Sequence, residues 1–209
     1  RKSGDMLEAA LTAGLCSMGA KVIPLGVVPT PAVAYLTRYY KADAGVVISA
    51  SHNPCEYNGI KFFNSDGYKL SDGIENEIES YILGEKAIEE LPTHGKVGYV
   101  SANHNAVEDY VAFAVSTIDC RLDGMKIAVD CANGASYETA FKALNKLGAN
   151  VEAIHNTPDG VNINHMCGST HMESLQAYVT SIGADIGIAF DGDADRMLAG
   201  DENGKLIDG

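Results

Sequence analysis

Positive charge is scarce in this sequence of 209 residues, which has 15 Lys and Arg residues against 28 Asp and Glu residues. The net charge of −13 and the lack of any Lys/Arg cluster argue against binding to nucleic acid, because such a surface repels a phosphate backbone. Uninterrupted apolar runs are also short, and none approaches the roughly 18 residues that a membrane span needs. We therefore expect neither nucleic acid nor a membrane as a partner.

Cysteine is too sparse and too irregular for a disulfide framework. The five cysteines are odd in number, widely spaced and mostly set among apolar neighbours, which indicates free thiols in a reducing compartment. We therefore expect a cytoplasmic protein. With 46% hydrophobic and 21% charged residues, the chain can bury a core and does not have the composition of a disordered protein. At about 150 residues per domain, its length corresponds to one or two domains.

Both ends of the sequence are unusual. It begins at Arg1 without a methionine, and it stops at Asp208-Gly209 directly after a strand-like segment. We expect the chain to be cut at both ends, so the lack of a signal peptide carries little information.

The first part of the chain alternates helical and strand-like patterns. Ser3 can cap a helix that Gly19 ends, and Pro31 suits the first turn of a second helix. The short β-branched run at residues 44–49 is typical of a strand buried on both faces. The other predicted elements are an edge strand at 22–25, a strand at 60–64, and helices at 32–40, from the capping box Asp72-x-x-Glu75 to about 83, and at 106–118.

The polar segment 119–124 is the predicted boundary between two domains, because the pattern restarts after it. The predicted elements that follow are strands at 126–130, 150–154, 185–190 and 197–200, and helices at 137–147 and from the capping box Thr170-x-x-Glu173 to 182. Alternating strands and helices predict two consecutive α/β/α domains with mostly parallel (mixed) sheets, spanning residues 1–118 and 119–209.

The most distinctive segment is Asp191-Gly192-Asp193-Ala194-Asp195-Arg196, which directly follows an apolar strand pattern. Its three carboxylates, two residues apart, can converge on one cation, and without a cation they repel one another strongly. Oxygen ligands select a hard ion such as Mg²⁺ or Ca²⁺ over Zn²⁺. A solvated acidic turn explains the loop equally well when the loop is considered alone.

Three more specific interpretations compete for this loop. In an EF-hand, the three aspartates and Glu202 would fall on ligand positions, but Arg196 stands where that loop needs glycine and the flanks are strand-like, so we reject it. In a phosphatase of the haloacid-dehalogenase type, Asp191 would be the nucleophile, although that class expects a small β-branched residue at position 195 and more chain downstream. The third interpretation is the metal site of a phosphoryl-transfer enzyme whose nucleophile lies elsewhere.

A candidate nucleophile lies in Ser49-Ala50-Ser51-His52-Asn53-Pro54, directly after the predicted buried strand. Serines at the carboxyl ends of such strands lie where α/β sheets place ligands. Ser51 is followed by an imidazole and an amide, and both can orient phosphate oxygens. Taken alone, the segment is also explained as an ordinary Ser/Asn/Pro turn.

The two loops together resemble the N-terminal half of an α-D-phosphohexomutase, most closely the bacterial branch that acts on glucosamine phosphate. The similarity runs almost from end to end of the chain. The segments that carry it are Arg1-x-Ser3-Gly4, Val28-Pro29-Thr30-Pro31, Ser49–Pro54, Asn58-Gly59-Ile60-Lys61-Phe62-Phe63, Asp130-Cys131-Ala132-Asn133-Gly134-Ala135, Gly160-Val161-Asn162-Ile163-Asn164, Cys167-Gly168-Ser169-Thr170-His171 and Phe190–Arg196.

The resemblance implies a phosphoserine enzyme that interconverts glucosamine 6-phosphate and glucosamine 1-phosphate through a bisphosphate, on the route to UDP-N-acetylglucosamine and the cell wall. A sugar 1,6-bisphosphate would prime it. A phosphomannomutase/phosphoglucomutase of the same family is the nearest alternative, and a non-catalytic cation-binding fragment is another. The resemblance implies that Ser51 is the phosphoserine and that Mg²⁺ is held by Ser51, Asp191, Asp193 and Asp195. It implies that Lys61 is a general acid/base and that His52 is an oxygen-orienting or proton-handling neighbour. It also implies that Arg1, Asn53 and Arg196 bind phosphate, with Arg196 holding the phosphoserine.

Members of this family share their cleft among four domains. The resemblance therefore implies that domains 3 and 4, which read the sugar and grip the other phosphate, lie outside this chain, as does the first strand with its catalytic arginine. We expect the chain alone to lack mutase turnover. Homodimer formation is an alternative that the sequence leaves open. Tyr35, Tyr39 and Tyr40 on the second predicted helix suit either a core or a subunit interface.

Overall fold

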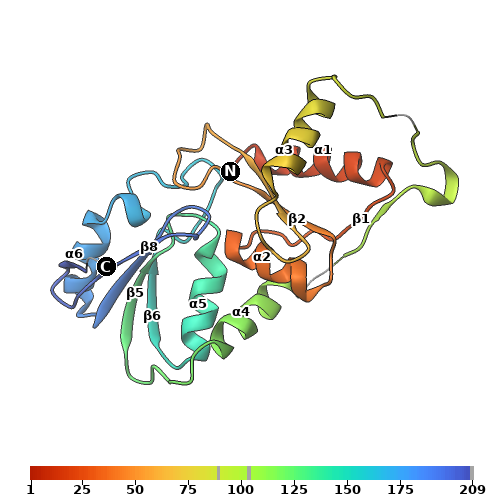
Figure 1. The fold of residues 1–209 in the computed structure, drawn as a ribbon. Helices are drawn as coiled ribbons and strands as arrows, with labels where there is room; N and C mark the ends of the chain where they lie inside the picture. Colours follow the sequence, from red (N-terminus) through yellow and green to blue (C-terminus); the bar gives the residue numbers. More distant parts are fainter. Residues whose placement is uncertain (89, 103–104, 208–209) are drawn as a thin grey trace.

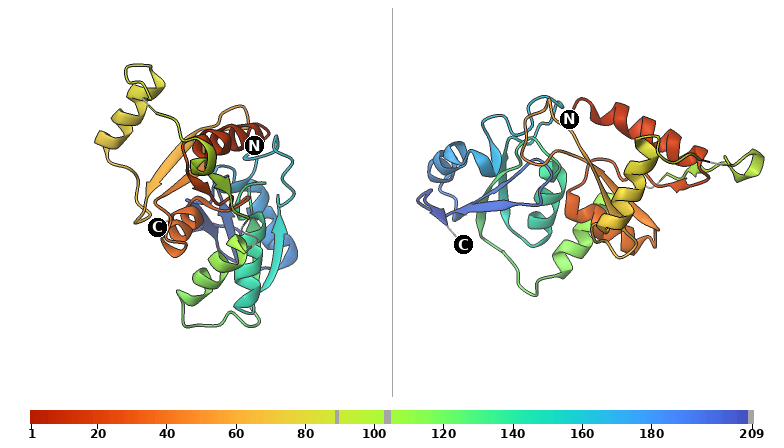
Figure 2. Two further views of the ribbon diagram at one scale, coloured as in Figure 1. Left: turned by 90° about the vertical axis from the view of Figure 1, so that its right-hand side faces the viewer. Right: turned by 45° about the horizontal axis from the view of Figure 1, so that its top comes forward.

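A computed structural model describes residues 1–88, 90–102 and 105–207, so the terminal Asp208 and Gly209 of the predicted second domain lie outside the described part. Two lobes stand side by side in Figure 1, the first built from α1 to α3 with β1 to β4 and the second from β5 to β9 with α5 and α6. Helix α4 connects them, and the N-terminus lies where the lobes meet in all three views (Figures 1 and 2).

The elements up to α4 alternate along the chain as the sequence predicts. They are α1 (Gly4–Ser17), β1 (Lys21–Val22), α2 (Thr30–Tyr39), β2 (Ala44–Ile48), β3 (Ile60–Asn64), α3 (Asp72–Ile82), the short 3₁₀ turn η1 (His94–Lys96), β4 (Tyr99–Val100) and α4 (Ala106–Ser116).

The second lobe restarts the alternation. Its elements are β5 (Lys126–Asp130), α5 (Ser136–Lys146), β6 (Asn150–Ile154), the 3₁₀ turn η2 (Gly168–Thr170), α6 (Glu173–Ile182), β7 (Ile186–Phe190), β8 (Met197–Gly200) and β9 (Leu206–Ile207).

A five-stranded sheet in the order β6-β5-β7-β8-β9 forms the centre of the second lobe. β5 pairs in parallel with β6 and β7, whereas β8 is antiparallel to both β7 and β9. On β5, Ala128 packs against Leu175 and Val179 of α6, while Ile127 and Val129 face the opposite side, which α5 covers. Because side chains alternate along a strand, a continuously apolar strand is buried on both faces. The predicted α/β/α class with a mixed sheet is confirmed in this lobe.

Within the described residues, the strands of the first lobe form two separate pairs. β1 is parallel to β4, and β2 is antiparallel to β3, with Val47 opposite Lys61. α2 packs on β2 through Ala32, Val33 and Val47. The predicted strand at 22–25 is shifted, since β1 ends at Val22, before Pro24, whose nitrogen has no hydrogen to donate to a ladder.

Helix α4 contacts both lobes. The ring of Phe113 stacks on Tyr35 of α2 with 3.8 Å between centroids, and Asp109 accepts a 2.6 Å hydrogen bond from the Tyr40 hydroxyl. On its other side, Glu108 pairs with Lys142 and Lys146 of α5 at 2.7 and 2.8 Å. Tyr35 and Tyr40 therefore lie between α2 and α4, whereas Tyr39 is exposed.

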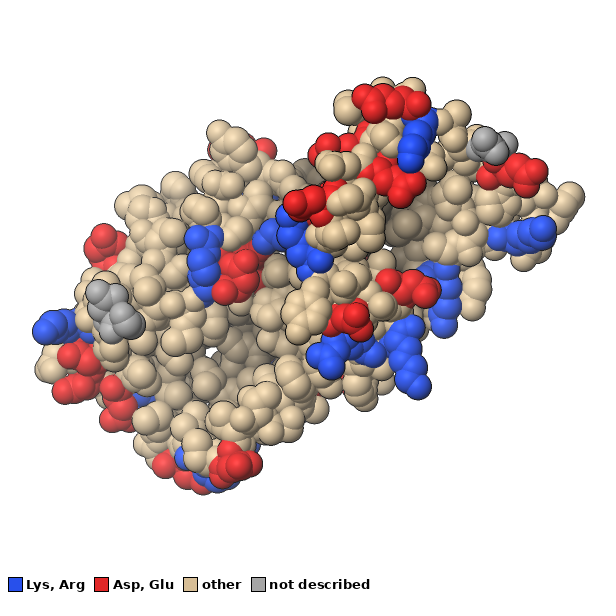
Figure 3. All heavy atoms as spheres, in the orientation of Figure 1, with Lys and Arg blue, Asp and Glu red and all other residues tan. Residues whose placement is uncertain are grey.

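Both predicted capping boxes are wrong. Ser71 is the N-cap of α3, so Asp72 already lies inside the helix. Thr170 belongs to η2, and α6 begins at Glu173 after Met172. Over the part of the chain that the structure describes, no helix has the length and apolar character needed to cross a membrane. Acidic side chains gather along the upper edge in Figure 3, where α3 carries Asp72, Glu75, Glu77 and Glu79.

Candidate active site at the junction of the lobes

The acidic loop lies between β7 and β8, at the carboxyl end of a strand paired in parallel with β5. Asp191 and Asp193 are 1% and 2% exposed, whereas Asp195 lies at the surface. Each of the three offers a carboxylate oxygen within 4.8 Å of the others. Ala194, in a left-handed conformation with φ of 53°, turns the loop so that the three carboxylates converge.

These donors fit a hard divalent cation. Oδ2 of Asp193 accepts hydrogen bonds from Lys61 Nζ at 2.7 Å and Thr30 Oγ1 at 3.0 Å. Its Oδ1 is buried and has no hydrogen-bond partner among the described residues. A buried, unpartnered carboxylate oxygen is costly, and a cation would satisfy it. The oxygen-only set favours Mg²⁺ or Ca²⁺, as predicted.

The pKa values of Asp193 and Asp195 shift in opposite directions, because Lys61 acts against burial at Asp193. Burial, reinforced by the charges of Asp193 and Asp191, raises the pKa of Asp195. Burial also pushes the pKa of Asp193 upward, but the hydrogen bond and ion pair with Lys61 outweigh it, so this pKa lies below its ordinary value. Lys61 thus keeps one buried carboxylate ionised beside two others.

Ser51, in the loop that follows β2, reaches this acidic loop although it lies 140 residues away in sequence. Its hydroxyl donates to Asp191 Oδ2 at 2.7 Å and accepts from Arg196 Nη2 at 2.5 Å. Ser51 has φ of 52°, a conformation that is costly for a non-glycine residue and persists only where the surroundings enforce it. The predicted nucleophile and the predicted metal loop are therefore in direct contact.

Arg196 connects the other predicted residues of the site. Its Nη2 lies 3.1 Å from Asp191 Oδ2 and also contacts His52 Nδ1, and its Nε lies 3.5 Å from Asp195. His52 itself is exposed. Lys61 reaches Asp195 as well, at 3.7 Å. The positive side chains of Lys61 and Arg196 thus offset part of the negative charge of the three carboxylates.

Arg1 and Asn53 lie at the back of the Ser51 loop. The Arg1 guanidinium donates to the carbonyl oxygens of Ser51 at 2.8 Å, Asn53 at 3.0 Å and Pro54 at 2.5 Å. Burial lowers the pKa of Arg1. Because these contacts of Arg1 are to backbone carbonyls, the geometry supports a role in holding the loop, and phosphate binding by Arg1 and Asn53 stays a prediction.

Two residues at the site were not assigned any role from the sequence. Thr30, at the start of α2, donates its N–H to the Asp193 carbonyl at 2.9 Å in addition to its hydroxyl contact. Asn164 donates from Nδ2 to the carbonyls of Ser51 and Asn53. Both stand in segments that carry the family resemblance, but a sequence segment alone does not reveal a contact to the other lobe.

A glycine pair lets the acidic loop pack against the start of α5. A Cβ on Gly134 would lie 2.4 Å from the Gly192 carbonyl oxygen, which accepts a 2.8 Å hydrogen bond from the N–H of Ala135. Gly134 therefore allows close backbone packing at this helix start.

A second cluster of potential metal ligands, Asp130, His155 and Cys167, lies in the second lobe. The fully buried Asp130 carboxylate accepts from Ala132 N, Gly168 N and His155 Nδ1 at 2.8, 2.9 and 3.0 Å. Burial, reinforced by Asp130, raises the pKa of Cys167 to about 12, so it is a thiol at neutral pH. These bonds tie three loops together, which is a structural role.

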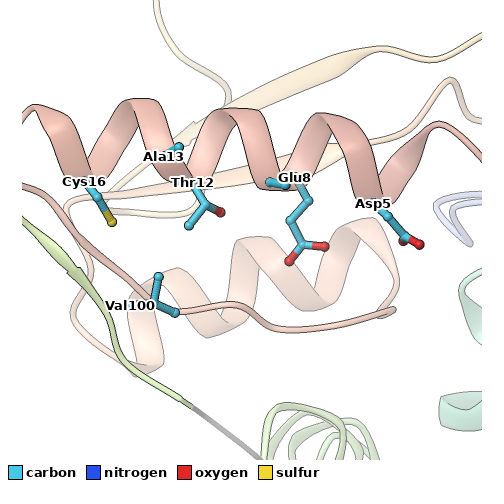
Figure 4. Close-up of a pocket in the computed structure, with 7 residues that line it drawn as sticks. Asp5, Glu8, Thr12, Ala13, Cys16 and Val100 are labelled. Carbon is cyan, nitrogen blue, oxygen red and sulfur yellow. The ribbon is translucent and has the colours of Figure 1, made fainter.

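A shallow pocket of about 440 Å³ lies along α1, where Glu8, Thr12 and Cys16 face Val100 of β4 (Figure 4). None of the predicted site residues lines it. This pocket is therefore separate from the acidic loop and the Ser51 loop.

The fold and the site define an α/β protein in which a serine contacts an acidic loop. The carboxylate oxygens of this loop are suited to a cation. The sequence profiles described as "Phosphoglucomutase/phosphomannomutase, alpha/beta/alpha domain I" and "domain II" match residues 1–89 and 106–204. The chain belongs to the phosphoglucomutase/phosphomannomutase family, which confirms the predicted resemblance. The second match begins with α4, and the predicted boundary at residue 119 stays a prediction.

Known relatives give the similarity in more detail. The chain is 63% identical to the phosphoglucosamine mutase of Acetivibrio thermocellus and 62% identical to that of Ruminiclostridium cellulolyticum, over its whole length and 46% of theirs. Among solved structures, a phosphoglucomutase/phosphomannomutase family protein from Burkholderia thailandensis has a TM-score of 0.79 at 28% identity, with 96% of this chain and 44% of that chain covered. The chain thus spans about half the length of the relatives it matches.

Proposed function

We propose that this chain forms the phosphoserine and metal domains of a phosphoglucosamine mutase, which interconverts glucosamine 6-phosphate and glucosamine 1-phosphate. The observation that carries the proposal is the 2.7 Å hydrogen bond from Ser51 to Asp191 in the acidic loop. The high identity to enzymes named phosphoglucosamine mutase supports the choice of sugar.

The proposed chemistry begins with a phosphoryl group on Ser51. The bond between Ser51 Oγ and phosphorus breaks as the sugar hydroxyl oxygen bonds to phosphorus, and the hydroxyl proton passes to a base. We propose Lys61 as this base in its neutral amine form, because the ammonium form that pairs with Asp193 and Asp195 can only donate a proton. Arg196, in contact with Ser51 Oγ, would hold the phosphoryl group, with His52 orienting its oxygens. A Mg²⁺ ion held by Asp191, Asp193, Asp195 and a phosphoserine oxygen would offset charge on the transferred group.

The reverse transfer completes the reaction. The bisphosphate formed from glucosamine 6-phosphate returns its 6-phosphoryl group to Ser51, which leaves glucosamine 1-phosphate and the phosphoserine. The numbers of phosphoryl groups and protons are conserved, so a sugar 1,6-bisphosphate is needed only to prime an unphosphorylated serine.

Two further properties belong to the same proposal. Because the relatives are about twice as long, we propose that sugar recognition needs segments that this chain does not contain, and that the chain alone does not turn over. The five free cysteines support a reducing, cytoplasmic location. Homodimer formation also stays a prediction.

A different sugar is the second candidate, because the family profiles describe phosphoglucomutase and phosphomannomutase. The aspartyl-phosphatase alternative has less support. Asp191 is buried, and both its oxygens already accept hydrogen bonds, Oδ2 from Ser51 and Arg196, and Oδ1 from the Arg196 N–H. It is therefore poorly placed to attack a phosphate.

A chimaera tests the proposed function. Joined to the C-terminal half of the Acetivibrio thermocellus enzyme, the chain should form glucosamine 1-phosphate in a coupled assay, while the chain alone should not. Ser51→Ala should reduce the chimaera's rate by more than about a thousandfold, because the phosphoryl carrier is lost. Ser17→Ala, on an exposed turn of α1, is the matched control.

Three results would contradict it. They are turnover by the isolated chain, a folded chimaera that forms no glucosamine 1-phosphate, and a phosphorylated form whose extra mass persists in Ser51→Ala.

A further inference from the structure

We propose that Asn164 is a positioning residue that fixes the Ser51 loop against the acidic loop. This inference rests on the proposed function for its chemical consequence. Asn164 lies in the polar loop between β6 and α6, within a segment to which the proposed mechanism gives no role.

The contacts of Asn164 cross from the second lobe to the first. Its Nδ2 donates to the carbonyl oxygens of Ser51 at 2.9 Å and Asn53 at 3.0 Å, across 113 and 111 residues of sequence. Arg1 donates to the same two carbonyls. The side-chain amide must present its NH₂ group there, because both neighbours are acceptors.

Asn164 also touches the acidic loop. A Cβ on Gly192 would lie 2.7 Å from Asn164 Nδ2 and 2.8 Å from the Ser51 carbonyl oxygen. The amide therefore sits where the backbones of both loops come together. A side chain at position 192 would push them apart, which accounts for the glycine between the first two aspartates.

The residue itself is held firmly. Asn164 is 8% exposed, its N–H donates to the Ala132 carbonyl at 3.0 Å, and its φ of 57° is one that asparagine tolerates better than most residues. Its Oδ1 is buried with no hydrogen-bond partner in the described part of the chain. At this position the protein uses the NH₂ group of the amide as a hydrogen-bond donor and does not use its oxygen as an acceptor.

The consequence for Ser51 is orientation. Ser51 adopts a strained left-handed conformation, and its N–H donates to Ser49 Oγ at 3.0 Å. With its carbonyl held from behind by Asn164, its hydroxyl points at Asp191. Small misplacements of a reacting group can lower a rate by about a hundredfold, so loss of this contact should be visible in phosphoryl transfer.

Amide hydrogen exchange on the 209-residue chain tests the contact directly. Asn164→Asp replaces the donor by a carboxylate oxygen facing two carbonyls, so exchange at the Ser51 and Asn53 amides should rise by about tenfold or more, while amides of α5 keep their rates. Asn164→Ala, which removes the donor without adding charge, serves if the first variant folds poorly. Asn145→Asp, on the surface of α5, is the control.

Phosphoryl transfer from glucose 1,6-bisphosphate to Ser51 of the chimaera described above, followed by intact mass, is the second readout. Slower transfer in Asn164→Asp, with Mg²⁺ affinity kept, supports the positioning role. Unchanged exchange at Ser51 and Asn53, exchange that rises equally across the chain, or unchanged transfer despite a loosened loop would overturn it. If the unmodified chimaera accepts no phosphoryl group while exchange responds as expected, the proposed chemistry fails and the Asn164 contact stands.

Discussion

Three aspartates held within 4.8 Å of one another need compensating charge. In this chain Lys61 and Arg196 supply part of it, yet one oxygen of the buried Asp193 is left without a partner. A hydrogen-bonded acidic turn would have no reason to leave such an oxygen unsatisfied. At the scale of single residues, this atom is the strongest sign of a cation site.

Asp193→Asn should therefore weaken Mg²⁺ binding by about tenfold or more, because it removes a ligand charge from a buried position of the loop. Isothermal titration of the 209-residue chain with Mg²⁺ measures this affinity. Asp5→Asn, an exposed position on α1, should leave the affinity unchanged. If the Asp193 variant and the unmodified chain bound Mg²⁺ with equal affinity, the proposed metal site would be contradicted.

Elements explain why the functional loops lie where they do. The strands that precede the loops, β2 and β7, are short apolar runs flanked by polar turns, so their position was predictable from the sequence to within a residue. The bounds of β3, β5, β6 and β8 match the predicted ones. The local hydrophobic pattern is sufficient to predict the bounds of these strands, because packing within a sheet determines which of their residues are apolar.

Other features could not be predicted, because they depend on contacts between distant segments. β4 has two residues and exists through its pairing with β1, so it leaves no periodic pattern. Thr30 and Asn164 reach partners 163 and 113 residues away. The two capping boxes failed because neither helix start uses a side-chain cap: the N-cap residues are Ser71 and Met172, and neither makes a side-chain capping hydrogen bond.

Helix α4 provides a pH-dependent contact between elements. The hydrogen bonds from Lys142 and Lys146 lower the pKa of Glu108 to about 2. A carboxyl with a lowered pKa in the folded state contributes stability that is present above its ordinary value and is lost as the pH falls towards 2. The contribution is small and weakened by salt, because these side chains are exposed.

Glu108→Gln should lower the melting temperature by a few degrees at pH 7 and by less near pH 2. Thermal unfolding of both proteins across this pH range, at low and at high salt, measures the difference. Glu8→Gln on α1 is the matched control. A difference that stays constant down to pH 2 would contradict the assignment of the shift to the α4–α5 contact.

At the scale of the whole molecule, the two lobes depend on each other for the site. The first supplies Ser51, Lys61 and Thr30, and the second supplies the three aspartates and Asn164. The contact between Ser51 and Asp191 therefore exists only where the two lobes meet. Lys61 from the first lobe and Arg196 from the second bring positive charge to this site in a strongly negative chain, which suits a site that must accept phosphate.

The central claim is that a cation in the acidic loop touches the phosphate carried by Ser51. Phosphoserine encoded at position 51 of the 209-residue chain allows a direct measurement by ³¹P NMR with Mn²⁺ in place of Mg²⁺. Since Mn²⁺ prefers the same oxygen ligands, one equivalent should broaden the phosphoserine resonance beyond detection, and a chelator should restore it. A resonance that stays sharp while calorimetry shows the loop filled with Mn²⁺ would contradict the shared site.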